Sequence, residues 1–179
     1  MMLSGAFMAK IRSNTVVVCD AGPLIHLDEV GHLQLLADFK KVIVPHGVRR
    51  EVNNHRRISF EEADISWSLV KAVFPLEQSV KTICNLFSLD AGEKESLSLL
   101  NNEPDAIFLT DDAAARIVAI KLGYRVHGTI GVLVRAIRRD LLNPEEVADA
   151  LQRIRDVSTL YIKNSLLQEV ITKVKQEQR

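Results

Sequence analysis

Apolar residues along the chain form short continuous runs, separated by longer stretches with helical spacing. The runs at residues 16–19, 41–45, 106–110 and 124–129 are short, and several are rich in β-branched residues, as is typical of buried strands. Between them, apolar residues recur three and four positions apart, which predicts amphipathic helices. This alternation predicts an α/β fold with a central parallel sheet covered by helices on both faces, a three-layer α/β/α arrangement.

Capping residues and mixed periodicity refine this pattern. The stretch D-A-G-E places Asp90 three positions before Glu93, which is the spacing of a capping box at a helix start. Residues 60–80 carry both periodicities, and we predict a helix at residues 61–67 and a strand at residues 69–74. A last helix is predicted at residues 160–175.

Composition indicates a soluble, cytoplasmic, globular protein. The 179 residues are 47% hydrophobic and include 23 basic and 23 acidic side chains, so net charge alone does not attract this chain to nucleic acid. No apolar run approaches the ~18 residues of a membrane helix. Two cysteines make no disulfide framework. We expect an N-terminal tail at residues 1–14, a main domain at 15–143, and a C-terminal helical extension at 144–179 that packs on the same domain.

Carboxylates follow two of the predicted strands directly. Asp20 comes after the first run, and Asp111 and Asp112 come after the run at 106–110. Ligands bind beyond the carboxyl ends of parallel strands, so these side chains belong on the rim where sites form. Glu51 and Glu93 lie early in the helices that we expect near the same rim. Such acids repel one another unless a cation neutralises them, and Mg²⁺ prefers oxygen ligands of this kind.

Each of these acids also has a simple structural interpretation. Asp20 and Asp112 can cap the helices that follow them, and Glu93 completes the D-A-G-E capping box. Glu51 fits a solvated helix face between basic neighbours. The functional hypothesis therefore rests on the convergence of several acids and not on any single one.

Four longer stretches resemble the PIN-domain family, small α/β nucleases that include the VapC toxins of VapBC-type toxin–antitoxin pairs. The opening VVVCDAGPLIHL is similar to the family's first strand, aspartate and helix, and VIVPHGVRREV to its second strand and glutamate-bearing helix. LDAGEKESLSLL resembles the Gly-Glu helix of one PIN subgroup. The most specific match is IFLTDDAAARIVAIKLGYRVHGTIGVL, which contains the subgroup's acidic strand end and its GT-G-L segment.

This resemblance implies an acidic catalytic set of Asp20, Glu51, Glu93 and Asp111. The metal ligands it implies are Asp20, Glu93 and Asp111, with Asp112 as an alternative or an addition to Asp111. A Thr-x-Asp pattern common in toxin-type members selects Asp112, whereas the subgroup pattern favours Asp111.

The implied activity is hydrolysis of RNA phosphodiester bonds with Mg²⁺ or Mn²⁺, by the toxin of a toxin–antitoxin-type pair. Arg49, Arg50 and Arg116 are the basic residues nearest the acids in sequence and the expected contacts to RNA. The resemblance also implies a homodimer and a small antitoxin protein as a partner. Gly22 stands where many members carry Ser or Thr. The alternative is therefore a catalytically weak or inactive PIN-like module that binds a partner protein or RNA.

Overall fold

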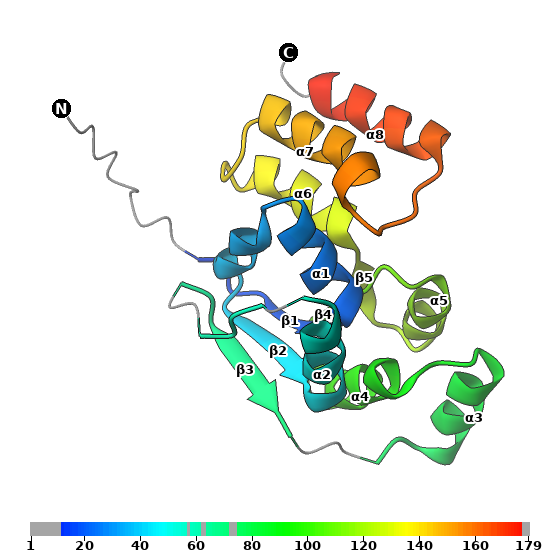
Figure 1. Cartoon of the computed structure of the whole chain (residues 1–179). Coiled ribbons are helices and arrows are strands. Elements are labelled where there is room, and N and C mark those ends of the chain that lie inside the picture. Colours follow the sequence, from blue (N-terminus) through cyan, green and yellow to red (C-terminus); the bar gives the residue numbers. More distant parts are fainter. Residues whose placement is uncertain (1–11, 57, 62–63, 72–74, 177–179) are drawn as a thin grey trace.

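The computed structural model describes residues 12–56, 58–61, 64–71 and 75–176. Its strands are β1 (Val16–Cys19), β2 (Lys41–Pro45), β3 (Trp67–Val70), β4 (Ile107–Leu109) and β5 (Arg125–His127). They form one five-stranded sheet in the order β3-β2-β1-β4-β5, and every neighbouring pair is parallel. The predicted parallel sheet is confirmed (Figure 1).

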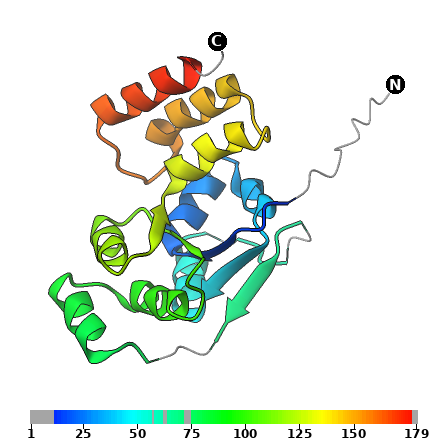
Figure 2. The same ribbon diagram turned by 180° about the vertical axis from the view of Figure 1, so that it is seen from behind.

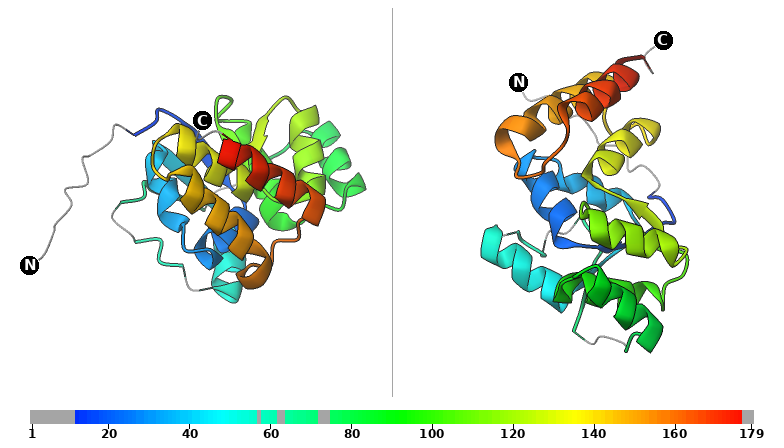
Figure 3. Two further views of the ribbon diagram at one scale, coloured as in Figure 1. Left: turned by 90° about the horizontal axis from the view of Figure 1, so that it is seen from above. Right: turned by 90° about the vertical axis from the view of Figure 1, so that its right-hand side faces the viewer.

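Helices cover both faces of this sheet, which confirms the three-layer arrangement (Figures 2 and 3). Their bounds are α1 (Ala21–Glu29), 3-10 helix η1 (Leu33–Asp38), α2 (His46–His55), α3 (Gln78–Leu86), α4 (Ala91–Leu100), α5 (Ala113–Lys121), α6 (Thr129–Arg138), α7 (Pro144–Val157) and α8 (Asn164–Gln176). The helices α1, α6, α7 and α8 lie on one side of the sheet, and α3, α4 and α5 lie on the other. Helix α2 contacts both α1 and α4 near the carboxyl ends of the strands.

Side-chain alternation along β1 divides the core into these two layers. Val17 points into the cluster formed with α1, α6 and α7, whereas Val18 points into the cluster formed with α4 and α5. Both residues are fully buried because β1 is the central strand, paired with β2 on one side and β4 on the other. Because β1 and β4 are parallel, their carboxyl ends lie next to each other at one rim of the sheet.

The C-terminal helices share the core of the α1 face. Leu151 and Ile154 of α7 and Leu167 of α8 are fully buried in the same cluster as α1. Glu29, the last residue of α1, accepts hydrogen bonds from the hydroxyl of Ser158 at 2.8 Å and the backbone N–H of Thr159 at 3.0 Å. The connection between α7 and α8 is thus fastened to the end of α1.

The predicted helix at residues 61–67 is wrong for the residues that the structure describes there. Trp67 already belongs to β3, and the backbone carbonyl of Ser66 accepts from Val42 of β2 at 2.9 Å. Pairing with β2 therefore overrides the helical spacing of this segment. Strand β3 ends at Val70, and residues 72–74 of the predicted strand lie outside the described residues.

Helix α3 was not expected from the sequence. Its apolar residues Val80, Ile83 and Cys84 have helical spacing and pack against the core on the α4 and α5 side, so the periodic signal was present and was overlooked. No helix in the described part of the chain is both long enough and apolar enough to cross a membrane.

Candidate active site

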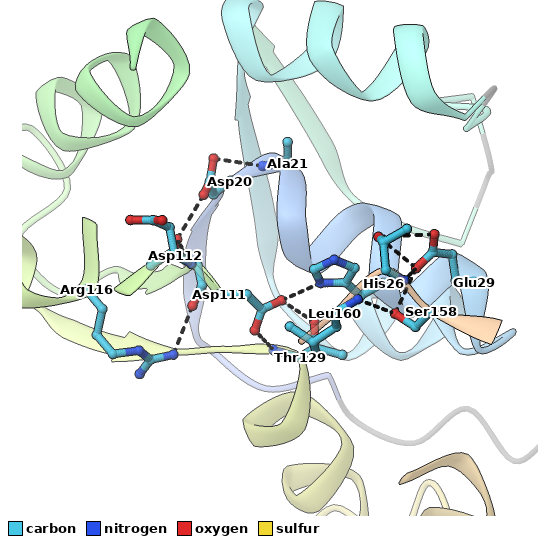
Figure 4. Close-up of polar contacts among 12 residues, drawn as sticks. Asp20, Ala21, His26, Glu29, Asp111, Asp112, Arg116, Thr129, Ser158 and Leu160 are labelled. Carbon is cyan, nitrogen blue, oxygen red and sulfur yellow. Dashed lines mark hydrogen bonds and ion pairs between the residues drawn. The ribbon is translucent and has the colours of Figure 1, made fainter. Parts of the chain in front are cut away.

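Asp20 lies where β1 ends and α1 begins, and it is the N-cap of that helix. Its Oδ1 accepts from the backbone N–H of Ala21 at 2.8 Å, and its Oδ2 accepts from the hydroxyl of Thr110 at 2.8 Å (Figure 4). The residue is only 7% exposed because β1 occupies the centre of the sheet. The predicted cap is confirmed, and the Thr110 hydroxyl ties it to the end of β4.

Burial raises the pKa of Asp20 to about 6. The hydrogen bonds from Thr110 and Ala21 oppose this shift, since they stabilise the ionised form. The negative charges of Glu51 and Asp90 raise the pKa further. Asp20 is therefore a buried carboxylate whose surroundings favour its neutral form.

Glu93 has the same character in the first turn of α4. It forms the predicted capping box with Asp90: the Glu93 side chain accepts from the Asp90 backbone N–H at 2.8 Å, and the Asp90 carboxylate accepts from the Glu93 backbone N–H at 2.8 Å. The residue is 8% exposed. Burial, and then the charges of Asp90, Asp112 and Asp20, raise the pKa of Glu93 to about 7 against the effect of the backbone hydrogen bond.

Asp111 and Asp112 are adjacent in sequence but point in different directions (Figure 4). Asp112 is exposed and caps α5, where its Oδ1 accepts from the backbone N–H of Ala115 at 2.7 Å. Its charge raises the pKa of Glu93, so Asp112 lies within electrostatic range of that side chain. The side chain of Asp111 is directed instead toward α1 and α6.

Both oxygens of Asp111 are occupied by hydrogen bonds. Oδ1 accepts from the Thr129 backbone N–H at 2.8 Å, and Oδ2 accepts from the Thr129 hydroxyl at 2.6 Å. The ring Nδ1 of His26 also lies 2.8 Å from Oδ2 and donates when it carries the proton. Asp111 thereby links the end of β4 to α1 and α6. Asp112 therefore acts electrostatically on Glu93, whereas the charges of Asp111 and Asp20 both act on Cys19 beneath the rim.

Glu51 lies on α2 and is half-buried. Burial raises its pKa, and the charge of Asp90 adds to the shift while His55 opposes it. Asp90 therefore interacts with Asp20, Glu51 and Glu93, although its place in the sequence predicts only a cap. Its position directly before α4 is the signal that could have added it to the acidic set. We call Asp20, Glu51, Asp90, Glu93 and Asp112 the acidic cluster.

The three predicted RNA-contacting arginines lie in different surroundings. Arg116 donates from Nη2 to the backbone carbonyl of Thr110 at 2.9 Å, so it borders the acidic cluster. The guanidinium of Arg49 lies over the ring of Phe60, 5.8 Å from its centroid, and Arg50 is exposed on α2. Arg116 is the arginine of this set that contacts the framework of the cluster.

Gly128 makes room for this framework. A Cβ atom there would lie 2.9 Å from Nη2 of Arg116 and 3.2 Å from the backbone oxygen of Thr110, and it would overlap Oδ1 of Asp111. The supporting roles of Thr110, Thr129 and His26 were not predicted. The Thr-x-Asp and GT-G-L patterns contain two of these residues and were the available signal.

The acidic cluster suits a hard divalent cation by its chemistry. Its donors are carboxylate oxygens, and no ion pair among the described residues involves any of its members. No three His, Cys, Asp or Glu side chains in the described ranges already surround a single point that a metal could occupy.

A comparison with protein families matches residues 16–176 to a family described as a PIN domain. No curated protein and no solved structure matches the chain significantly. The matched range extends from β1 into α8 and so includes the acidic cluster and both C-terminal helices. PIN domains are generally nucleases, and these nucleases typically use divalent metals. The chain belongs to the PIN-domain family.

Proposed function

We propose that this protein is a metal-dependent ribonuclease. The observation that carries the proposal is the pair of buried carboxylates, Asp20 and Glu93, whose pKa values are raised to about 6 and about 7. A carboxylate kept in the interior without a cationic partner destabilises the fold, and an added dication removes that penalty. Perturbed acids of this kind are characteristic of functional sites.

Asp20, Glu93 and Asp112 are the residues that would hold Mg²⁺ or Mn²⁺. When bound, such an ion lowers the pKa of a water molecule and offsets charge on a phosphate group. Thr110 and the backbone of Ala21 orient the Asp20 carboxylate, while the capping box orients Glu93. Glu51 is placed to act from α2, either toward a second ion or toward the attacking water.

Asp111 acts through its neighbours in this proposal. Its hydrogen bonds to Thr129 and His26 fix the turn between β4 and α5, and this turn presents Asp112 to the cluster. We therefore assign Asp111 a positioning role and Asp112 the role of a ligand. The Thr-x-Asp pattern of toxin-type members agrees with that choice.

The finer proposal is that the ribonuclease is a toxin that forms a homodimer and is restrained by a small antitoxin protein. Its support is the same uncompensated negative charge, because an arginine or lysine of a partner peptide would neutralise the cluster as a metal does. Light scattering of the purified protein tests the dimer, and co-purification with the product of a neighbouring small gene tests the antitoxin. A monomer with no such partner contradicts the toxin role.

Cleavage of single-stranded RNA by the purified full chain tests the enzymatic proposal. We expect cleavage with Mn²⁺ or Mg²⁺, none with EDTA, and a loss of about 10³-fold in Asp20→Asn. Asp28→Asn on α1 is a matched control outside the cluster and should cleave at the normal rate. Absence of cleavage with either metal, or equal rates in Asp20→Asn and the native chain, would overturn the proposal in favour of a binding module.

A further inference from the structure

A group of basic side chains lies along the β5 edge of the sheet, beside the acidic cluster. Arg125 and His127 alternate with Val126, and Val126 packs into the core on the α4 and α5 side. The side chains of Arg125 and His127 consequently emerge on the opposite face, toward α6. Both residues are exposed, because β5 is an edge strand paired only with β4.

Helix α6 brings further arginines to the same edge. It starts directly after β5 and packs against it, as the view onto the side of the molecule shows (Figure 3, right). The His127 side chain lies against Gly131, where a Cβ would be 3.3 Å from the Cβ of His127. Arg135 and Arg138 follow Gly131 on the same helix face, four and seven positions later. Both therefore start from the face of α6 against which His127 lies.

The electrostatic environment of His127 agrees with this geometry. Burial of part of the ring lowers its pKa first, and the positive charges of Arg116, Arg125, Arg135 and Arg138 lower it further. Arginines from β5, α5 and α6 therefore gather around one edge residue. Arg116 connects this edge to the acidic cluster through its bond to the Thr110 carbonyl.

The arginines differ in whether their charge is already neutralised. Arg135 is paired with Asp38 at 2.5 Å and stacks over the ring of Phe39 at 4.4 Å. Arg125 donates to the backbone carbonyl of Asp105, which leaves its charge without a carboxylate partner. Within the described part of the chain, Arg116, Arg125 and Arg138 take part in no ion pair. These three residues, with His127, form what we call the β5 basic edge.

We propose that the β5 basic edge binds the phosphate backbone of single-stranded RNA and leads it to the acidic cluster at Arg116. This inference rests on the proposed ribonuclease function and adds the path of the substrate. Its basis is charge complementarity to a polyanion and continuity with the cluster, in a chain whose net charge is zero. Phosphate contacts of this kind position a strand without reading its sequence.

Fluorescence anisotropy with a labelled RNA oligonucleotide of about 12 nucleotides tests the path, in EDTA so that no cleavage occurs. The test variant is Arg125→Ala/Arg138→Ala, and the matched control is Arg153→Ala/Arg155→Ala, two exposed arginines of α7 that give the same change in net charge. We expect affinity to fall about 10-fold in the test variant only. The slope of log affinity against log salt should fall by about 1.4, or about 0.7 for each phosphate that the protein no longer neutralises.

Arg138→Ala alone guards against a folding effect, since the Arg138 side chain makes no hydrogen bond or ion pair with a described residue. This single variant should give half of the change in slope. Equal binding by the test and control variants would overturn the path. Because binding is measured without metal, a chain that binds RNA through this edge but never cleaves it refutes the ribonuclease and leaves the path standing. If the native chain cleaves RNA and both variants bind RNA with unchanged affinity, the ribonuclease proposal stands and the proposed RNA path is refuted.

Discussion

Asp20 and Asp38 are two buried aspartates with nearly the same exposure, 7% and 6%, and opposite electrostatic surroundings. Asp38, at the end of η1, is paired with Arg135 at 2.5 Å and with Arg139 at 3.0 Å. The hydrogen bonds and charges of these arginines lower its pKa in spite of burial. Asp20 has neutral hydrogen-bond donors and acidic neighbours, and its pKa is raised to about 6.

The contrast separates acids whose charge is neutralised within the chain from acids that require a cation from outside. Asp38 joins η1 to α6 and is a structural ion pair, so it needs nothing further. Burial and acidic neighbours disfavour the ionised forms of Asp20 and Glu93, and a bound cation would offset that cost. Asp111 differs from both, since its oxygens accept hydrogen bonds from Thr129 and lie beside the His26 ring, with no arginine or lysine among its ion-pair partners in the described residues.

The largest expected effect separates the two neighbouring aspartates of the β4–α5 turn. Asp112→Asn should lower RNA cleavage by about 10³-fold with little change in stability, because it removes the proposed metal ligand at an exposed position where Asn can still cap α5. Asp111→Asn should instead lower the melting temperature and reduce cleavage less, about 10- to 100-fold, as positioning residues do. Parallel measurements of initial rates and thermal unfolding check both. The reverse ranking would assign the ligand role to Asp111.

Removing a carboxylate that the chain neutralises should destabilise the fold. Asp38→Asn leaves Arg135 and Arg139 without their shared partner, and we expect a loss of about 3 kcal/mol in the free energy of unfolding. Asp20→Asn in EDTA should cost little or stabilise the chain, because it removes a buried charge and keeps an acceptor oxygen. Urea denaturation measures the free energy of unfolding of both variants. Similar losses of stability in the two would contradict the distinction between Asp20 and Asp38.

The glycines at the site should respond in opposite ways to an added methyl group. Gly128→Ala presses a Cβ onto Asp111 and the Thr110 backbone, and should cost about 2 kcal/mol. Gly22→Ala places its Cβ at ordinary contact distances of 3.5 and 3.6 Å from Asp111 and His26, and should stabilise α1 by about 0.5 kcal/mol. Thermal unfolding of the two single variants measures this. A well-tolerated Gly128→Ala would refute the close packing of the turn.

The pH dependence of stability should have opposite signs for the two classes of acid. The folded-state pKa values of Asp20 and Glu93 are about 6 and about 7, above their ordinary values, so the folded chain binds more protons between about pH 4 and pH 7. Their contribution is therefore full below about pH 4 and is lost as pH rises through this window. The pKa of Asp38 is lowered in the folded state. Asp38 therefore stabilises the fold at pH values above the ordinary pKa of an aspartate, and this stabilisation is lost as the pH falls below that value.

Urea midpoints in EDTA at about pH 5 and about pH 8 test this sign. The native chain should lose stability at the higher pH, and Asp20→Asn/Glu93→Gln should lose less. An identical decrease in the double variant would attribute the effect to other groups.

The sheet and most helices were predictable because their signals are local. Continuous apolar runs identified β1, β2 and β4, and cap residues such as Asp90 marked where helices begin. Strand β3 was misplaced because its pairing with β2, a non-local contact, decides its limits. Helix α3 was overlooked although Val80, Ile83 and Cys84 recur at helical spacing.

The sequence was enough to predict that the candidate site consists of carboxylates and lies at the carboxyl ends of the strands. It was not enough to predict how these side chains are oriented. Asp20, Glu93 and Asp112 do lie near one another, since each follows or begins an element at the carboxyl ends of the strands. The orientation of Asp111 depends on Thr129 and His26, which lie 18 and 85 residues away in sequence. Only the folded structure shows that the Thr129 hydroxyl and the His26 ring contact the Asp111 carboxylate.

The junction between β1 and β4 also bears on how the protein is synthesised. Asp20 and Thr110, 90 residues apart, meet only when β4 has inserted beside β1. A nascent chain on the ribosome therefore carries no assembled centre until more than half of its length has been translated. For the proposed ribonuclease, this delay would protect the message and the ribosome that are producing it.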